Sequence, residues 1–97
     1  AYCMTKHAIE GLAKAMAVEL APWNIRVNTI APTFIETPLT RPFFDDPAFK
    51  EAVFNHIPMK KLGQIEDIAA ATVYLASDAA AMVTGTSLKV DGGWTAH

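Results

Sequence analysis

Apolar residues recur along the first twenty positions at the three- and four-residue spacing of an α-helix that packs on one side. The residues on this apolar side are Ile9, Leu12, Ala13, Met16, Ala17 and Leu20. Because Pro22 disfavours the helical conformation in the residue before it, the helix is expected to run from Tyr2 to about Ala21. The same spacing predicts a second helix from about Ile65 to Ser77. Its apolar side comprises Ile65, Ile68, Ala69, Thr72, Leu75 and Ala76.

Two segments have the alternating, β-branched composition of strands. The first covers Ile25 to Ala31 and is expected to stop at Pro32, and the second covers Thr86 to Val90. Between the first strand and the second helix lie about thirty residues with weak periodicity and several prolines. Loops of this length in compact domains are usually functional lids or disordered. The phenylalanines argue against disorder, so we expect a long excursion with one or two short helices, the better one near residues 47–56.

The order helix, strand, loop, helix, strand predicts an α/β fold. A crossover of this length implies that the two strands pair in parallel. Parallel sheets are almost always covered on both faces and contain several strands, which this chain does not supply. We therefore expect residues 1–97 to be the C-terminal portion of a single larger domain whose N-terminal half is absent from the chain.

The composition limits the possible functions. Of 97 residues, 52% are apolar and 19% are charged, and the net charge is -2. Such a globular chain lacks the basic surface that nucleic acids or acidic membranes attract. A single cysteine and the absence of a long apolar run predict a cytoplasmic protein without disulfides. Because His7, His56 and His97 lack the spacing of metal ligands, no metal site is expected.

Tyr2 and Lys6, at the start of the first helix, are the strongest clue to chemistry. Positions four apart lie on the same face of a helix, so the Lys6 ammonium can lie beside the Tyr2 phenol. A neighbouring cation favours the phenolate and lowers the phenol pKa from about 10 toward neutral pH. Such a phenol can exchange a proton with an alcohol or a carbonyl. Taken alone, this spacing is more often an ordinary surface pair.

Six short motifs place the pair in a wider context. They are Tyr2-x-x-x-Lys6, Arg26-Val27-Asn28-Thr29-Ile30-Ala31-Pro32, Ile35-Glu36-Thr37-Pro38, Leu62-Gly63-Gln64-Ile65-Glu66-Asp67-Ile68-Ala69, Val83-Thr84-Gly85 and Val90-Asp91-Gly92-Gly93. In this order they resemble the classical short-chain dehydrogenase/reductase family from its catalytic tyrosine to its C-terminus. The first motif alone is weak, but the other five in register make the resemblance specific, and it covers essentially the whole chain.

The resemblance implies a Rossmann-type doubly wound parallel sheet and an NAD(P)-dependent oxidoreductase. Such an enzyme would transfer a hydride between the nicotinamide and an alcohol or carbonyl substrate. Members of the 3-oxoacyl reductase type and of the sugar or polyol dehydrogenase type share this pattern. Tyr2 would be the general acid or base. Lys6 would lower the pKa of Tyr2 and bind the nicotinamide ribose, so both residues would also contact the cofactor.

The segment that follows the first strand would cradle the nicotinamide. It begins with Pro32 and Thr33, and in it the backbone of Ile35 and the hydroxyl of Thr37 would hold the carboxamide. This location agrees with the general rule that ligands bind at the carboxyl ends of strands in open α/β sheets. The family usually has glycine at the position of Thr33, and glycine allows a close backbone approach. The threonine therefore puts the detailed cofactor contacts in question.

The phenylalanine-rich segment after Thr37 would be the substrate lid, which closes to exclude water. The candidate lid residues are Phe43, Phe44 and Phe49. For each of them, a role in the core or in a subunit contact explains the sequence equally well. Trp94, near the end of the chain, is expected to pack at the end of an element or to serve a subunit interface.

The resemblance also implies a homodimer or homotetramer, with contacts through the tyrosine helix and the C-terminal helix–strand unit. The chain contains neither the residues that distinguish NAD from NADP nor any that identify the substrate. It also lacks the glycine-rich phosphate loop and the catalytic serine of the family. The alternative hypothesis is therefore a catalytically dead fragment that acts only in oligomerisation or protein interaction.

Overall fold

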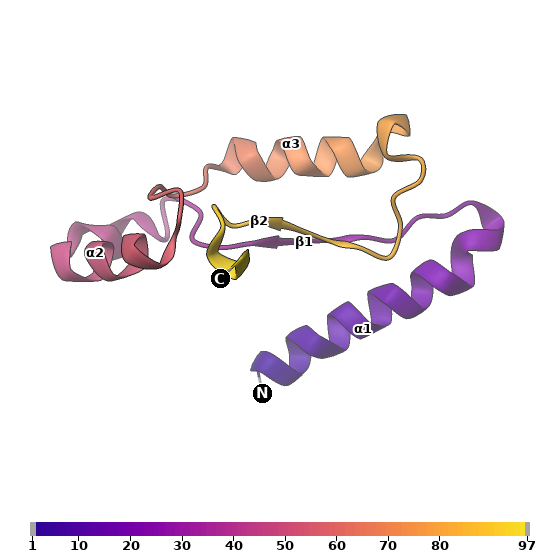
Figure 1. Cartoon of the computed structure of the whole chain (residues 1–97), viewed down its shortest axis with the longest axis horizontal. Coiled ribbons are helices and arrows are strands. Elements are labelled where there is room, and N and C mark those ends of the chain that lie inside the picture. Colours follow the sequence, from indigo (N-terminus) through magenta and orange to yellow (C-terminus); the bar gives the residue numbers. More distant parts are fainter. Residues whose placement is uncertain (1, 97) are drawn as a thin grey trace.

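A computed structural model describes residues 2–96, with the backbone alone described at Tyr2. The elements are α1 (Tyr2–Leu20), β1 (Thr29–Pro32), α2 (Pro47–His56), α3 (Ile65–Ala76) and β2 (Ser87–Val90), with short 3₁₀ turns at Ala21–Trp23, Arg41–Asp45, Asp78–Ala80 and Trp94–Ala96. The predicted helices are confirmed to within one residue. Figure 1 shows α1 and α3 on opposite sides of the strand pair. None of the helices within residues 2–96 is long and apolar enough to cross a membrane.

The two strands form a parallel pair, as the sequence predicts. Their register runs from Thr29 opposite Ser87 to Pro32 opposite Val90. The pairing is framed by two backbone hydrogen bonds. Thr29 N–H donates to the carbonyl of Thr86, and Thr33 N–H donates to that of Val90. Both strands therefore end at the same edge of the sheet.

The first strand differs from its predicted bounds at both ends. It starts later than expected, because Ile25 N–H donates to the carbonyl of Leu20 and Val27 N–H to the hydroxyl of Thr84 instead of to a partner strand. It also includes Pro32, which was expected to stop it. The residues that donate across the pair are Thr29 and Thr33, so the proline nitrogen is out of phase with the ladder. Its missing N–H therefore costs no hydrogen bond.

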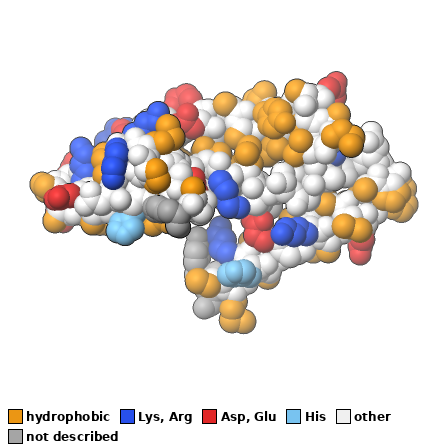
Figure 2. Space-filling model, viewed as in Figure 1, with side chains coloured by type: hydrophobic (Ala, Val, Ile, Leu, Met, Phe, Trp, Pro, Cys, Tyr) orange, Lys and Arg blue, Asp and Glu red, His pale blue; other side chains and the backbone are white. Residues whose placement is uncertain are grey.

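The apolar sides of the two long helices are covered only in part. On α1, Ala17 is 3% exposed, whereas Leu12 is 60% exposed. On α3, Ile68 and Leu75 are half-buried, but Ile65 is exposed. Hydrophobic side chains accordingly appear at the surface over α3 and along α1 (Figure 2). The prediction that the apolar sides are packed was wrong for Leu12 and Ile65, because two strands offer too little surface to cover them.

Side chains at the start of β1 fasten the connection between α3 and β2. The Arg26 guanidinium donates to the carbonyls of Ser77 and Val83 at 3.3 and 3.2 Å. The Asn28 amide donates to the same carbonyl of Val83 at 2.8 Å and accepts from Thr86 N–H at 3.1 Å. These bonds fix where β2 begins, and so they help to set the register of the pair.

The long excursion after β1 closes on itself at a neck. Ile35 forms a parallel bridge with Gly63, in which Glu36 N–H donates to the carbonyl of Gly63 and Gly63 N–H donates to that of Phe34. Within the excursion, Asp46 caps the start of α2, since its carboxylate accepts from Ala48 N–H. The inner side of this segment is packed, since Val53 is 6% exposed and Ile57 is 1% exposed. The excursion is therefore an ordered loop, as the phenylalanines predict.

A tight turn follows β2 and depends on the buried carboxylate of Asp91. It accepts from the Thr95 hydroxyl at 2.7 Å, from Gly93 N–H at 3.0 Å and from Thr95 N–H at 3.2 Å. The bond from the Thr95 hydroxyl is the main cause that lowers the pKa of Asp91 below its usual 3.8, and burial partly opposes it. The backbone bonds from Gly93 and Thr95 add to the lowering. The turn is thus held best by an ionised carboxylate.

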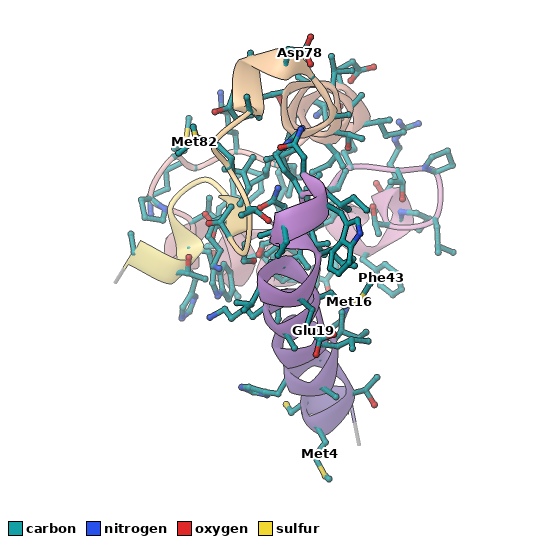
Figure 3. The ribbon with its side chains drawn as sticks, turned by 90° about the vertical axis from the view of Figure 1, so that its right-hand side faces the viewer. Met4, Met16, Glu19, Phe43, Asp78 and Met82 are labelled. Atoms are coloured by element: carbon teal, nitrogen blue, oxygen red, sulfur yellow. The ribbon has the colours of Figure 1, made fainter. Side chains whose placement is uncertain are left out.

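We expect Asp91→Asn to lower the free energy of unfolding at pH 7 by about 1–2 kcal/mol, because the amide accepts fewer hydrogen bonds than the carboxylate. Because folding lowers the pKa of Asp91, its ionised carboxylate stabilises the fold above pH 3.8. This contribution is lost as the pH falls through the pKa of the folded state. The gap between wild type and variant should therefore narrow below pH 3.8 in urea unfolding experiments. Asp78→Asn is the control, because that side chain is exposed (Figure 3). A gap that is independent of pH would contradict the assignment.

We expect Gly92→Ala to destabilise the protein by about 1–3 kcal/mol. The Gly92 φ is +62°, and an added Cβ would lie 2.8 Å from Cγ2 of Ile57, which is 1% exposed and cannot move away. Gly11→Ala is the matched control with the opposite sign. Nothing lies within 4 Å of the added carbon in that exposed helix, so about 0.5–1 kcal/mol of stabilisation is expected. Equal unfolding midpoints for the two variants would refute the close approach.

Candidate functional site

The carboxyl ends of the two strands frame the candidate site. A hollow of about 460 Å³ opens beside Thr33. Its other walls come from the segment that returns from the excursion, from the start of α3 and from the turn after β2, and they include Met59, Gly63, Asp67 and Asp91. Of the residues predicted to bind the cofactor, Thr33 lines this hollow, whereas Ile35 and Thr37 are not among its lining residues. The ligand expected at this edge therefore stays a prediction.

The backbone turns sharply at Phe34, directly after the position where the family usually has glycine. Of the non-glycine residues described, only Asn24, Phe34 and Lys60 have a positive φ, and that of Phe34 is +49°. Thr33 therefore keeps an ordinary conformation, so this position does not require the usual glycine for its backbone angles. The strain of the turn falls on Phe34 instead.

Ile35 presents its backbone away from the neck of the excursion. The bridge to Gly63 uses the carbonyl of Phe34 and the N–H of Glu36, which flank Ile35 on either side. Peptide groups alternate in direction along an extended chain, so the N–H and carbonyl of Ile35 point to the opposite side. On that side the carbonyl accepts from the Thr40 hydroxyl at 2.7 Å. The N–H of Ile35 thereby points to the same side, away from Gly63.

Thr37 and Thr40 form a compact hydrogen-bonded turn. Thr37 N–H donates to the Thr40 hydroxyl oxygen at 2.9 Å, and Thr40 N–H donates to that of Thr37 at 3.1 Å. The two hydroxyl oxygens lie 3.1 Å apart. Because the Thr40 proton already goes to the Ile35 carbonyl, the Thr37 hydroxyl donates in this pair. Thr37 retains a lone pair for a ligand amide.

Sequence reasoning missed Thr40, although it fixes both groups that were expected to hold a carboxamide. Its hydroxyl binds the carbonyl of Ile35 and accepts from Thr37 N–H. The spacing of two threonines around Pro38, in a stretch without helical periodicity, is a signal that could have revealed it, since Ser and Thr hydroxyls stabilise local turns.

The proposed acid–base pair lies on the opposite side of the sheet from α3. Tyr2 belongs to the first turn of α1, but its side chain lies outside the described residues, as does His97. The side chain of Lys6 is exposed. The helix runs back along the sheet, so that its first turn lies toward the end where both strands finish (Figure 1). The structure thus provides the helical spacing of the pair, and the roles of Tyr2 and Lys6 stay predictions.

The first turns of α1 project away from the other described elements. Met4 is 77% exposed and stands at the free tip of the helix (Figure 3). Closer to the sheet, the Glu10 carboxylate accepts from the Thr29 hydroxyl at 2.9 Å. Glu10 therefore anchors the helix to the start of β1, and the buried Ala17 lies beside Gly85, just before β2.

The candidate lid phenylalanines form one aromatic cluster. Phe49 contacts Phe44 and Phe43, with ring centres 5.4 and 6.4 Å away, and Phe44 meets Phe34 edge-on at 6.3 Å. Phe43 remains 61% exposed at the rim of the cluster (Figure 3). The cluster joins the excursion to the turn after β1, and both the lid and the packing interpretation of these residues stay open.

Comparisons with known proteins identify the family of this chain. Residues 1–95 match the protein family described as enoyl-(acyl carrier protein) reductase. D-erythrulose reductase of Gallus gallus is 45% identical over 93 residues, which are 96% of this chain and 38% of that protein. The chain thus spans about two-fifths of the length of this relative.

Two solved structures have the same fold over 99% of this chain. The first is an Agrobacterium tumefaciens protein assigned as a 2-deoxy-D-gluconate 3-dehydrogenase, with bound NADP, at a TM-score of 0.93 and 46% identity over 39% of its own length. The second is 4-hydroxyisoleucine dehydrogenase complexed with NADH, at a TM-score of 0.94 and 41% identity over 40% of its length. The family match, the relative and the shared Rossmann-type fold together show that this chain belongs to the short-chain dehydrogenase/reductase family.

Proposed function

We propose that residues 1–97 are the C-terminal portion of an NAD(P)-dependent oxidoreductase that interconverts an alcohol and a carbonyl compound. Its main structural support is the segment after β1, which presents the Ile35 N–H and the Thr37 hydroxyl at the edge where both strands end. The fragment alone is expected to be inactive, because the glycine-rich loop and the catalytic serine of the family are absent from its sequence.

The proposed substrate is a small hydroxylated ketone, sugar or polyol. Relatives that act on such compounds support this class. They include D-erythrulose reductase and the protein assigned as a 2-deoxy-D-gluconate 3-dehydrogenase. A 3-oxoacyl substrate is the second candidate, because the resemblance of the sequence motifs includes members of the 3-oxoacyl reductase type.

The cofactor that we propose is NAD or NADP, because similar proteins were solved with NADP or with NADH. Bound nicotinamide would accept or donate the hydride. The residues present fit its carboxamide, since Ile35 can donate through its N–H and Thr37 can accept through the remaining lone pair of its hydroxyl. Thr40 would hold both groups in place. Pro32 and Thr33 would form the start of the cradle.

The proton in this reaction is assigned to Tyr2. In reduction its phenol would protonate the carbonyl oxygen, and in oxidation its phenolate would take the alcohol proton. Lys6, one helical turn away, would favour the phenolate by its positive charge and bind the nicotinamide ribose. The excursion that carries Phe43, Phe44 and Phe49 would cover the substrate and exclude water.

We also propose a cytoplasmic homodimer or homotetramer. Large exposed apolar residues on α1 and α3 support an assembly, because isolated soluble chains rarely leave so many uncovered. Among them are Met4, Val18 and Val73. The same surfaces would serve the alternative function, in which the chain acts only in protein interaction.

Tyr2→Phe in the full-length protein is expected to lower kcat by about 10²–10⁴-fold, because it removes only the proton donor. Turnover would be followed with NADH or NADPH against a panel of ketoses and 3-oxoacyl esters. Binding of the dinucleotide should change less than about twofold, since the aromatic ring remains. Tyr74→Phe on α3 is the matched control and should keep full activity. An active Tyr2→Phe enzyme would overturn the proposed mechanism.

Thr37→Val is expected to weaken dinucleotide binding by about tenfold, which corresponds to one lost hydrogen bond. Thr37→Ser, which keeps the hydroxyl, should restore most of the affinity. Thr72→Val provides the control, because that hydroxyl donates to the Ile68 carbonyl within α3. The measurement is a titration of cofactor fluorescence in the full-length protein. Equal dissociation constants for Thr37→Val and Thr72→Val would exclude Thr37 from the cofactor site.

A further inference from the structure

Trp94, in the last turn of the chain, lies between two segments that are distant in sequence. Its ring centre is 5.1 Å from that of Phe34, with the two planes inclined by 48°. The ring centre of Trp94 also lies 5.5 Å from that of the His56 imidazole, and these two planes are inclined by 33°. Both distances fall within the range of favourable aromatic pairs. Trp94 therefore connects Phe34 and His56 through side-chain packing.

These two neighbours belong to segments with different proposed tasks. Phe34 holds the left-handed turn directly before Ile35, in the segment proposed to cradle the nicotinamide. His56 is the last residue of α2, in the excursion proposed to cover the substrate. The His56 ring is itself oriented, because Nδ1 donates to the carbonyl of Ala52 at 2.9 Å. Trp94 thus touches the end of the lid helix on one side and the cofactor segment on the other.

The turn that carries Trp94 is fixed to the returning end of the excursion. Met59 N–H donates to the carbonyl of Gly92 at 3.0 Å. The glycines allow a close approach, since a Cβ on Gly93 would lie 3.0 Å from Cγ of Pro58. Figure 1 shows this turn at the end of the strand pair that lies nearest to α2. The position of Trp94 is therefore set by the sheet, and the lid helix is held against it.

Hydrogen bonds also hold the backbone on both sides of the Trp94 side chain. The backbone N–H of Trp94 donates to the Asp91 carbonyl at 3.1 Å. The Asp91 carboxylate accepts from the backbone N–H and from the hydroxyl of Thr95, the next residue. Trp94 is half-buried in this setting. The backbone at Trp94 and Thr95 is thus tied to Asp91, directly after β2.

We propose that Trp94 is a positioning residue that sets how the α2 end of the substrate lid rests against the cofactor segment. This inference rests on the proposed oxidoreductase function, and it assigns to the C-terminal turn a task in substrate binding. Without the indole, α2 would keep its helical hydrogen bonds but lose the surface against which His56 packs. The lid would then occupy the substrate-binding position for a smaller fraction of the time.

The test compares Trp94→Ala and Trp94→Phe in the full-length protein by hydrogen exchange and by steady-state kinetics. We expect Trp94→Ala to speed exchange of the amides in residues 48–57 by about tenfold and to leave α3 unchanged. The KM for the carbonyl substrate should rise by about tenfold, while kcat and the dissociation constant of the dinucleotide change less than about twofold. Trp94→Phe, which keeps an aromatic ring, should restore most of both effects.

Trp23→Ala is the matched control, because this tryptophan is 70% exposed at the end of α1, and it should resemble wild type. Unchanged exchange and KM in Trp94→Ala would overturn the proposal. So would faster exchange in α3 to the same extent, since that outcome indicates a general loss of stability. If the wild-type protein shows no dinucleotide-dependent turnover, the proposed function fails, and the exchange of residues 48–57 alone still decides whether Trp94 holds the lid helix.

Discussion

The parallel pairing of β1 with β2 is the constraint on which the other features depend. Its last hydrogen bond, from Thr33 N–H to the Val90 carbonyl, brings both chains to the same edge before they leave the sheet. The candidate cofactor segment starts on one strand and the Asp91 turn on the other. A shift of one residue in register would turn the side chains of one strand to the opposite face. The contact of Phe34 with Trp94 therefore exists only in this register.

Local patterns predicted the helices well and the contacts between distant segments poorly. α2 has its predicted bounds, because Pro47 and Asp46 mark its start within a few residues. The predicted bounds of β1 were wrong, because the extent of the strand depends on which N–H groups face β2, and Pro32 is tolerated for that reason. The role of Thr40 could have been predicted from the local spacing of the two threonines. The packing of Trp94 on His56 has no local sequence signal, because it requires the closed neck of the excursion.

The uncovered apolar surfaces follow from the small size of the sheet. Two strands of four residues each can bury a few side chains of α1 and α3, and within residues 3–20 of α1 only Ala17 is buried. A sheet with more strands on the other side of β1 would offer the surface that Leu12 and Met16 lack. The chain spans about two-fifths of its relatives, and the apolar faces are consistent with our proposal that further elements of the same domain pack there.

The candidate site is preorganised by bonds that involve no ligand. Two hydrogen bonds between Gly63 and the neighbours of Ile35 hold this residue in place. The Thr40 hydroxyl donates to the carbonyl of Ile35. The N–H of Ile35 is then held in its direction without any rearrangement, which would reduce the ordering cost of binding. The hydrogen bonds of the neck would thus hold the cofactor segment, whereas Trp94 would hold the end of α2. Loss of the indole would therefore weaken substrate binding and leave cofactor binding nearly unchanged.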